Sequence, residues 1–323
     1  MEGGGGYGVA VDIGATNTRV AVGDAGGRLL AKASFQTRSI KAPRELAEKI
    51  ALHARELASR LGVEPSAVGV GTAGPLDPVR GRIVNSPNMP FKEIPLAEPL
   101  REELGLPVAV ANDCNAAVIG EKTWGAGRGL DNLVYVTIST GIGGGAYVDG
   151  VLLLGKDGNA AEIGHIVVDS EERLVCGCGG RGHWEAYSSG SGIPRLAALL
   201  AQSSPDLWSR SMLSELGTIA AKDVFKAYRD GDPFAKLVIG EVRRYNAYGF
   251  AAVVNNYDPE LITVGGSVAL YNPDVLLRGL RRDVERYAIN RVPEIELTPL
   301  GGDAVLLGAL AIALGREEKV KPV

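Results

Sequence analysis

The sequence predicts an α/β protein with mixed sheets. Short runs rich in Val and Ile, such as 7–13, 68–72 and 133–139, alternate with longer segments of helical periodicity, such as 43–61 and 233–256. Each half of the chain opens with two short runs joined by a Gly-containing turn, which is typical of a β-hairpin and makes the sheets mixed rather than purely parallel. At 323 residues the chain is long enough for two domains.

The first half contains five predicted strands and two predicted helices. Runs of β-branched residues between Gly-rich or Asn/Asp turns indicate the strands. Pro43 in the first turn, Glu–Lys and Glu–Arg pairs at helical spacing, and Gly62 after the last periodic residue indicate the first helix. We expect strands at 7–13, 18–22, 29–36, 68–72 and 108–110, and helices at 43–61 and 115–124.

The second half repeats this alternation. We expect strands at 133–139, 146–148, 261–264 and 295–298, and helices at 185–200, 233–256, 273–287 and 304–314. No low-complexity linker interrupts the chain. We therefore predict a small α/β domain formed by 1–111 plus 302–323 and a large α/β domain formed by 112–301, with hinges near residues 112 and 301.

Composition excludes several classes of protein. The net charge is -4 and no block of Lys or Arg occurs, so we expect no binding to nucleic acid. The longest apolar stretch, 304–314, falls short of the ~20 residues that cross a bilayer, and residues 1–6 do not look like a signal peptide. We expect no membrane contact and a cytoplasmic location. Three Cys are too few for a disulfide framework, and scarce Gln and Cys suggest a hot habitat.

Three glycine turns that follow strands are candidates for nucleotide binding. In 12–19, backbone N–H groups can converge on an anion, hydroxyl and amide side chains can add hydrogen bonds, and Asp12 can hold Mg²⁺ through water. A second such turn spans 139–145, and Gly265-Gly266-Ser267 ends a third strand. Taken alone, the first turn could equally be a plain hairpin with a polar tip. The candidate residues are Asp12, Gly14, Thr16, Asn17, Thr18, Thr140, Gly141, Gly143, Gly265 and Gly266.

The pair Asn112-Asp113 stands at a predicted strand end just before a helix. Either residue could serve as a helix N-cap. The alternative is catalytic, because phosphoryl transfer needs one group that receives the proton of the attacking hydroxyl. The two roles can coexist.

The segment 162–185 has the most specific pattern. It holds two of the three His and two of the three Cys of the chain. His165, Cys176, Cys178 and His183 can form a tetrahedral set of two sulfur and two nitrogen ligands, which zinc prefers, and four protein ligands imply a structural site. The alternative is two buried thiols and two surface histidines.

Together these turns resemble the actin, hexokinase and chaperone-ATPase superfamily, and the motifs are similar to those of the sugar-kinase branch of the ROK family. The family pattern has a third Cys where this chain has His183, and histidine can replace a thiolate on zinc. The matching motifs are 12–19, 71–75, Asn112-Asp113, 139–145, Glu162-x-Gly-His165 and Cys176-x-Cys-Gly-x-x-Gly-His183-x-Glu185. The resemblance implies a two-domain actin-like (ribonuclease H-like) ATPase fold with an interdomain cleft.

The resemblance also implies an activity and its residues. The chain would use ATP to phosphorylate the 6-hydroxyl of a hexose, glucose being the expected sugar, with Mg²⁺ on the nucleotide and structural Zn²⁺. Asp113 would be the catalytic base. The implied hexose-binding residues are Gly74, Asn88, Asn112, Asp113, Glu162, His165 and Glu185. His165 would serve both zinc and sugar, the phosphates would lie at the turns of Thr16 and Gly141, and the adenosine at Gly265-Gly266.

Other functions share some of these motifs. A kinase for N-acetylglucosamine or N-acetylmannosamine shares all of them, and the loops of Gly74 and Asn88 would decide whether an acetyl group fits. A sugar-responsive repressor would need a helix-turn-helix ahead of the first strand, for which Tyr7 leaves no room. A non-kinase ATPase or filament protein would not need the sugar and zinc motifs. Relatives suggest a homodimer.

Overall fold

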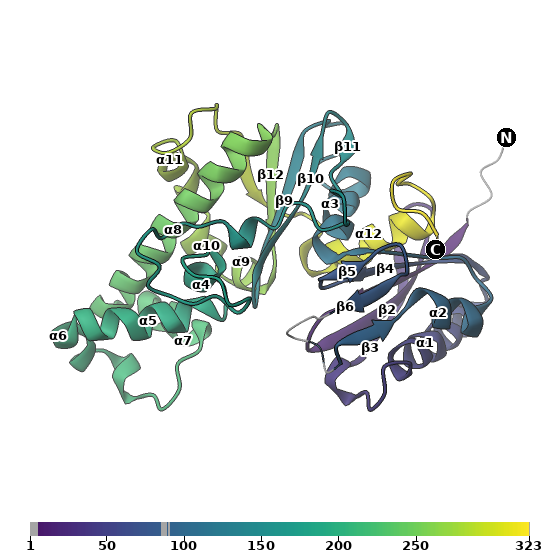
Figure 1. Cartoon of the computed structure of the whole chain (residues 1–323), viewed down its shortest axis with the longest axis horizontal. Helices are drawn as coiled ribbons and strands as arrows, with labels where there is room; N and C mark the ends of the chain where they lie inside the picture. The colour runs from purple at the N-terminus through teal and green to yellow at the C-terminus, as the bar shows by residue number, and fades with distance from the viewer. Residues whose placement is uncertain (1–5, 85–88, 90, 323) are drawn as a thin grey trace. The chain divides into compact units, whose positions relative to one another are not determined.

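The computed structural model describes residues 6–84, 89 and 91–322. Two compact units form: unit 1 comprises 1–135, 145–161 and 298–323, and unit 2 comprises 136–144 and 162–297. Each of the two large sheets contains parallel and antiparallel pairs, and helices accompany both, so the predicted mixed α/β class is confirmed (Figure 1). The units divide the chain elsewhere than at residues 112 and 301, and the predicted domains stay a prediction.

The main sheet of unit 1 joins an antiparallel hairpin to parallel strands. Its order is β3-β2-β1-β4-β8. Strands β1, β2 and β3 pair antiparallel, whereas β1, β4 and β8 pair parallel, so the hairpin that the first glycine turn predicts is confirmed. The strands are β1 Tyr7–Ile13, β2 Asn17–Asp24, β3 Leu29–Gln36, β4 Pro65–Thr72 and β8 Val108–Asn112.

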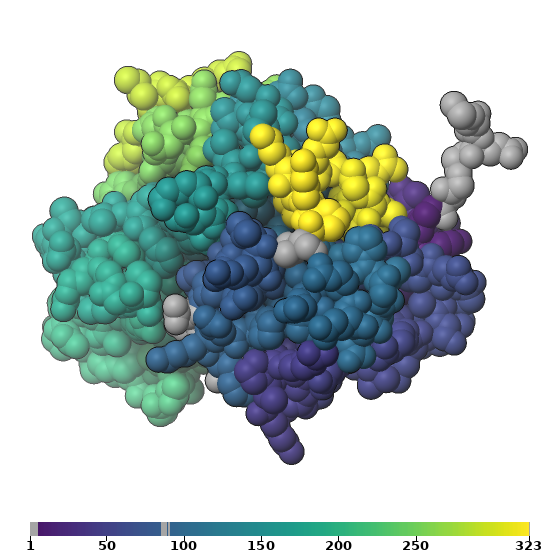
Figure 2. All heavy atoms as spheres, turned by 45° about the vertical axis from the view of Figure 1, so that its right-hand side comes forward, coloured from purple at the N-terminus to yellow at the C-terminus, as the bar shows by residue number. Residues whose placement is uncertain are grey.

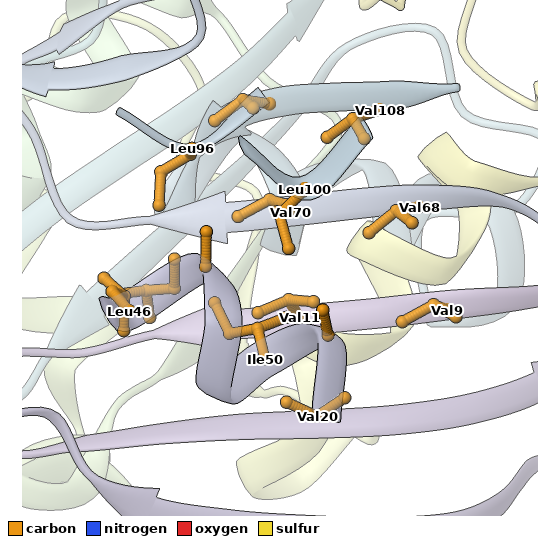
Figure 3. Close-up of a cluster of buried hydrophobic side chains, with 14 of the residues drawn as sticks. Val9, Val11, Val20, Leu46, Ile50, Val68, Val70, Leu96, Leu100 and Val108 are labelled. Carbon is orange, nitrogen blue, oxygen red and sulfur yellow. The ribbon is translucent and has the colours of Figure 1, made fainter. Parts of the chain in front are cut away.

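Helices cover both faces of this sheet. Helices α1 (Glu45–Leu61) and α2 (Ala97–Leu104) pack on one face, where Val11, Val70 and Ile50 are fully buried (Figure 3). Helices α3 (Asp113–Trp124) and α12 (Ala304–Ala313) lie on the other face. A smaller antiparallel sheet is formed by β5 Leu76–Asp77, β6 Arg82–Val84 and β7 Glu93–Pro95. The 3₁₀ turns of this unit are η1 Thr37–Ser39 and η4 Gly301–Asp303.

The second large sheet has the order β11-β10-β9-β12-β13. Two of its strands, β9 and β10, are divided between the units: residues 133–135 and 145–148 belong to unit 1, and residues 136–138 and 142–144 belong to unit 2. The strands are β9 Leu133–Ile138, β10 Ile142–Val148, β11 Val151–Leu152, β12 Leu261–Gly265 and β13 Glu294–Leu297.

Helices form most of unit 2, and the longest of them carries much of its core. Trp184 is fully buried, donates from Nε1 to Asn246 Oδ1 at 2.9 Å, and packs edge-on against Phe250. The helices are α4 Glu185–Ser188, α5 Gly192–Ser203, α6 Pro205–Ser209, α7 Ala221–Arg229, α8 Pro233–Tyr257, α9 Ser267–Tyr271, α10 Pro273–Leu276 and α11 Leu280–Val284, with 3₁₀ turns η2 Ile163–His165 and η3 Met212–Glu215.

Two predicted helices are wrong in extent. The helix predicted at 185–200 breaks into α4 and α5, because Ser189 is extended and its hydroxyl accepts from Gly192 N at 3.0 Å. The helix predicted at 273–287 breaks into α10 and α11, because Gly279 takes a left-handed φ of 78°. The predicted elements did not include the helices α2, α6, α7 and α9 or the short strands β5, β6, β7 and β11.

No helix in the described part of the chain is both long enough and apolar enough to cross a membrane. The residues that follow α12 (yellow in Figure 2) line a cavity of about 320 Å³ together with Ala67 and Pro107. These two residues stand at the amino ends of β4 and β8. The cavity is therefore at the opposite end of the parallel strands from the polar turns that follow them.

Helices α3 and α12 pack in direct contact, and this packing requires glycine at position 308. A Cβ on Gly308 would lie 1.5 Å from the carbonyl oxygen of Ala116, so the two helices would have to separate. We expect Gly308→Ala to lower the free energy of unfolding by about 1–3 kcal/mol, the usual cost of overpacking. Urea unfolding monitored by circular dichroism measures this change.

Gly240→Ala is the matched control. Gly240 is exposed inside α8, with no atom within 4 Å of the added methyl group. Alanine should there stabilise the protein by about 0.5–1 kcal/mol, because it restricts the unfolded chain and favours helix. Equal effects of the two substitutions would show that α3 and α12 do not pack as described.

Candidate active site and metal centre

In unit 1, three predicted motifs stand at the same edge of the sheet. Parallel pairing places Ile13 opposite Thr72 and Thr72 opposite Asn112. The chain leaves all three strands at this edge, into the turn 14–17, into Gly74, and into Asp113. A Cβ on Gly74 would lie 3.3 Å from Asn112 Nδ2, so these two predicted sugar contacts are neighbours. Ligands of α/β proteins commonly bind at such carboxyl ends.

The first glycine turn is held by its neighbour η1. Gly14 N donates to Asn17 O at 3.0 Å, Thr37 N donates to Thr16 O at 2.9 Å, and Thr37 Oγ1 donates to Gly14 O at 2.7 Å. Thr16 and Asn17 are exposed at the tip, where they can reach a ligand. The hydroxyl of Thr18 is buried and lies 2.9 Å from that of Thr37, so it supports the turn from inside.

Asp12 forms an ion pair beside this turn. Arg19 lies opposite Asp12 in the hairpin and donates from Nε to Asp12 Oδ2 at 2.9 Å. Arg19 also donates to Asp303 Oδ1 at 3.1 Å, and Lys32 donates to Asp303 Oδ2 at 2.7 Å. Burial raises the pKa of Asp12, and Arg19 opposes that rise. Two carboxylates and two cations thus lie next to the predicted phosphate turn.

Asn112 supplies the N-cap of α3. Its Oδ1 accepts from Cys114 N at 2.8 Å, while its own backbone stays extended. Asp113 is the first residue of the helix, and its Oδ1 also lies 2.8 Å from Cys114 N. Of the two roles that the sequence left open, Asn112 takes the cap, and Asp113 stands next to it at the strand edge.

In unit 2, the second and third glycine turns meet. Gly266 has a φ of 85°, and a Cβ there would lie 2.5 Å from Ile138 O at the end of β9. Only glycine can therefore start α9 this close to β9. Ser139 O accepts from Gly190 N at 2.7 Å, and Thr140 O accepts from Ser191 Oγ at 2.9 Å. The second and third glycine turns, predicted to bind phosphate and adenosine, therefore lie side by side.

Glu185 connects the second glycine turn to the cysteine-rich loop. Its Oε2 accepts from Ile142 N at 3.0 Å, and its Oε1 lies 3.3 Å from Cys176 Sγ. A Cβ on Gly141 would lie 2.4 Å from Glu185 Oε2, so glycine is required for this contact. The predicted sugar ligand Glu185 therefore also fixes the shape of the predicted phosphate turn.

The four predicted metal ligands come together. The ligand atoms of His165, Cys176, Cys178 and His183 all lie within 4.8 Å of one another. Nδ1 of His165 is 3.7 Å from Sγ of Cys176, and Nδ1 of His183 is 3.3 Å from Sγ of Cys178. Tetrahedral zinc with its usual bond lengths places sulfur and nitrogen about 3.6 Å apart. The donor set therefore fits a closed zinc site.

His165 faces two ways. Its Nδ1 points to Cys176, and its Nε2 lies 3.7 Å from Glu162 Oε2. Burial raises the pKa of Glu162, His165 lowers it, and the nearby Glu185 raises it further. Burial also raises the pKa of Cys176 to about 12, which keeps this thiol protonated at neutral pH.

The remaining predicted site residues are distributed as follows. Gly74, Asn112 and Asp113 belong to unit 1, whereas Glu162, His165 and Glu185 belong to unit 2. Gly143 lies within β10 and Gly265 ends β12. Asn88 lies outside the described residues. A cavity of about 420 Å³ opens beside Glu162 and is lined by Ile166, Asn256 and Tyr257.

Sequence reasoning missed several residues around these motifs. Thr37 and Asp303 are distant in the chain from the turns they contact, and no local pattern marks them. Arg19 was included in its motif without a role, although its position opposite Asp12 in a predicted hairpin could have suggested the ion pair. Asp169, which accepts a hydrogen bond from Arg173 in the cysteine-rich loop, was missed as well.

Known proteins are similar over almost the whole chain. A family model described as ROK family matches residues 8–316. A glucokinase from Pyrobaculum calidifontis is 40% identical over 313 residues, which cover 97% of each chain.

Two solved structures share both sequence and fold. A ROK hexokinase from Thermus thermophilus has a TM-score of 0.81 at 33% identity, covering 94% of this chain and 96% of that one. A ROK family glucokinase from Streptomyces griseus, in complex with glucose and AMPPNP, has a TM-score of 0.77 at 34% identity, covering 96% of this chain and 100% of that one. The fold is that of the actin-like ATPases, and the chain belongs to the ROK family.

Proposed function

We propose that the chain transfers the terminal phosphoryl group of ATP to the 6-hydroxyl of a hexose, with glucose as the preferred sugar. The observation that carries this proposal is the similarity to glucokinases over nearly the full chain, at up to 40% identity. Apart from Asn88, the residues expected to perform the reaction lie in the described parts of the two units.

Asp113 is the proposed catalytic base. At the strand edge of unit 1 it would accept the proton of the 6-hydroxyl as that oxygen attacks the phosphorus. Asn112 already caps α3, so the carboxylate of Asp113 is not required for that purpose. Its position in the first turn also suits a negative charge, because the helix dipole stabilises the carboxylate there.

Hexose recognition rests on carboxylates. Sugar hydroxyls are donors, and Glu162 and Glu185 offer acceptor oxygens, while the Nε2 side of His165 is turned away from Cys176. We propose that these side chains bind ring hydroxyls, with Gly74, Asn88 and Asn112 completing the set. A site of this kind rejects sugars that lack a hydroxyl, because a buried acceptor would then stay unpaired.

Nucleotide binding is proposed for the glycine turns. The exposed Thr16 and Asn17 and the turns at Thr140-Gly141 and Gly265-Gly266 offer backbone N–H groups and hydroxyls to phosphates and adenosine. Gly14, Thr18 and Gly143 support these turns. Mg²⁺ bound to ATP would offset the charge of the phosphates, and we propose that Asp12 holds it through water while Arg19 stays paired.

Zinc is the proposed occupant of the cysteine–histidine cluster. His165, Cys176, Cys178 and His183 would hold it, and its contribution would be structural, because four protein ligands leave no open position. By fixing the ring of His165 and the thiol beside Glu185, the site would orient two sugar-binding side chains.

A coupled assay of ADP release tests the proposed reaction. We expect kcat/KM to be highest for glucose among glucose, mannose, fructose, glucosamine, N-acetylglucosamine and N-acetylmannosamine. A preference for an acetylated sugar would instead identify an N-acetylhexosamine kinase. No ADP release with any of these sugars would contradict the proposal altogether.

Substitution of Asp113 tests the base. We expect Asp113→Asn and Asp113→Ala to lower kcat at least ~100-fold, the usual scale of general-base catalysis, while glucose still binds. Steady-state kinetics and calorimetric titration with glucose measure the two effects. Asp157→Asn, an exposed carboxylate of the same unit, is the control and should leave kcat unchanged. Near-normal turnover of Asp113→Asn would remove this residue from the mechanism.

Zinc content tests the metal centre. We expect one zinc per chain by mass spectrometry of the purified protein, and loss of that zinc in Cys176→Ser and Cys178→Ser. His183→Cys should keep zinc, because a thiolate replaces the imidazole. Cys114→Ser is the control, since Cys114 is the one cysteine outside the cluster. Full zinc content in Cys178→Ser would show that the metal is not held as proposed.

A further inference from the structure

The two cysteines of the proposed metal centre lie on a loop, and different sets of hydrogen bonds hold its tip and its base. We call residues 169–182 the metal loop. At its tip, Cys176 N donates to Gly180 O at 2.7 Å and Gly179 N donates to Cys176 O at 3.0 Å. Two isolated antiparallel bridges join the two sides of the loop, one between Val167 and His183 at its base and one between Val175 and Arg181 near its tip. These backbone contacts shape the loop but do not attach it to the helices of unit 2.

Asp169 fastens the base of the loop. Its side chain is almost fully buried, and both carboxylate oxygens are bound. Arg173 donates from Nε to Oδ2 and from Nη2 to Oδ1, each at 3.0 Å, and its backbone N donates to Oδ2 at 3.2 Å. The hydroxyl of Tyr187 donates to Oδ2 at 2.6 Å. A carboxylate and a guanidinium in this two-bond geometry define the direction as well as the distance of the contact.

Two tyrosines connect Asp169 and Arg173 to helices α4 and α8. Tyr187 and Tyr245 are both buried, and their rings pack with centroids 4.3 Å apart. The hydroxyl of Tyr187 accepts from Leu174 N at 3.0 Å, and Arg173 donates to the hydroxyl of Tyr245. Tyr187 belongs to α4 and Tyr245 to α8. The loop is therefore joined to α8 at Arg173 and to α4, the helix that also presents Glu185, at Leu174. Arg173 and Leu174 lie three and two residues before Cys176.

The carboxylate of Asp169 stays ionised at neutral pH. Burial alone would raise the pKa of Asp169, but the hydrogen bonds from Arg173 and Tyr187 outweigh it and lower the pKa to about 2. The carboxylate is therefore ionised when the enzyme works, and no metal is needed to keep it so. Leaving such a buried donor set without its acceptor costs more than the bond itself contributes.

We propose that Asp169 is a positioning residue, which holds the metal loop in place independently of the metal and thereby presets Cys176, Cys178 and Glu185. It contacts neither metal nor sugar, and it acts through Arg173 and Tyr187. The expected effect of Asp169 on sugar binding rests on the proposed function. The expected effect of Asp169 on the metal does not rest on it, because the positions of the metal-binding side chains do not depend on the substrate.

Zinc release distinguishes positioning from general stability. The zinc-loaded protein is mixed with the chromogenic chelator 4-(2-pyridylazo)resorcinol, and the rate of zinc transfer is followed by absorbance. We expect Asp169→Asn to accelerate release at least about tenfold, the scale on which supporting residues affect metal sites. Tyr245→Phe removes one hydroxyl and leaves the carboxylate paired, so it should accelerate release less and serves if Asp169→Asn does not fold.

Asp232→Asn is the matched control. Asp232 is an equally buried carboxylate of unit 2, which caps α8 by accepting from Ala235 N at 2.9 Å and also accepts from Ser211 Oγ at 2.9 Å. Its loss should lower the thermal midpoint as Asp169→Asn does, without changing the rate of zinc release. Equal acceleration by Asp232→Asn, or a wild-type rate in both Asp169→Asn and Tyr245→Phe, would overturn the proposal.

Kinetics supply the second readout. If Asp169 presets Glu185, Asp169→Asn should raise KM for the hexose roughly tenfold, equivalent to ~1.4 kcal/mol, and raise KM for ATP much less. An equal rise in both would overturn the positioning role in sugar binding. If the wild-type protein phosphorylates no hexose, the proposed function fails, and the zinc-release comparison still decides the role of Asp169.

Discussion

The parallel pairing of β1, β4 and β8 determines where the polar motifs of unit 1 can lie. A parallel register brings every strand's carboxyl end to the same edge, so three segments separated by up to about a hundred residues along the chain meet there. Helices α1, α2, α3 and α12 bury both faces and leave only the edges for ligands. The glycine at the α3–α12 crossing, Gly308, lets the helix that begins at Asp113 lie close to its neighbour.

In unit 2 the corresponding constraint is the position of Glu185. One carboxylate oxygen accepts a hydrogen bond from the backbone of the second glycine turn, and the other lies beside the thiol of Cys176. A helix of four residues carries this side chain, and such a short helix contributes little order of its own. The proposed zinc centre on one side and the Asp169–Arg173–Tyr187 contacts on the other would therefore supply the rigidity that the proposed sugar-binding carboxylate requires.

The sequence alone predicted those features whose signals are local. The glycine turns, the strands that precede them and the four proposed metal ligands each occupy a short stretch. The ROK resemblance and the mixed α/β fold are confirmed. The break at Gly279 was not predictable from periodicity, because the apolar pattern continues on both sides of that glycine. The break at Ser189 did have a local signal, since the run 188–192 contains only Ser and Gly and Pro194 follows it. The contacts of Arg19 with Asp303 and of Arg173 with Tyr245 join residues far apart in the chain, and only the fold brings them together.

A crystal structure of the protein with glucose and AMPPNP tests the central claim most directly. The account predicts the 6-hydroxyl oxygen of glucose within about 3.2 Å of a carboxylate oxygen of Asp113, the reach of a general base. A glucose molecule bound with its 6-hydroxyl beyond hydrogen-bond reach of Asp113, directly or through one water, would contradict the account.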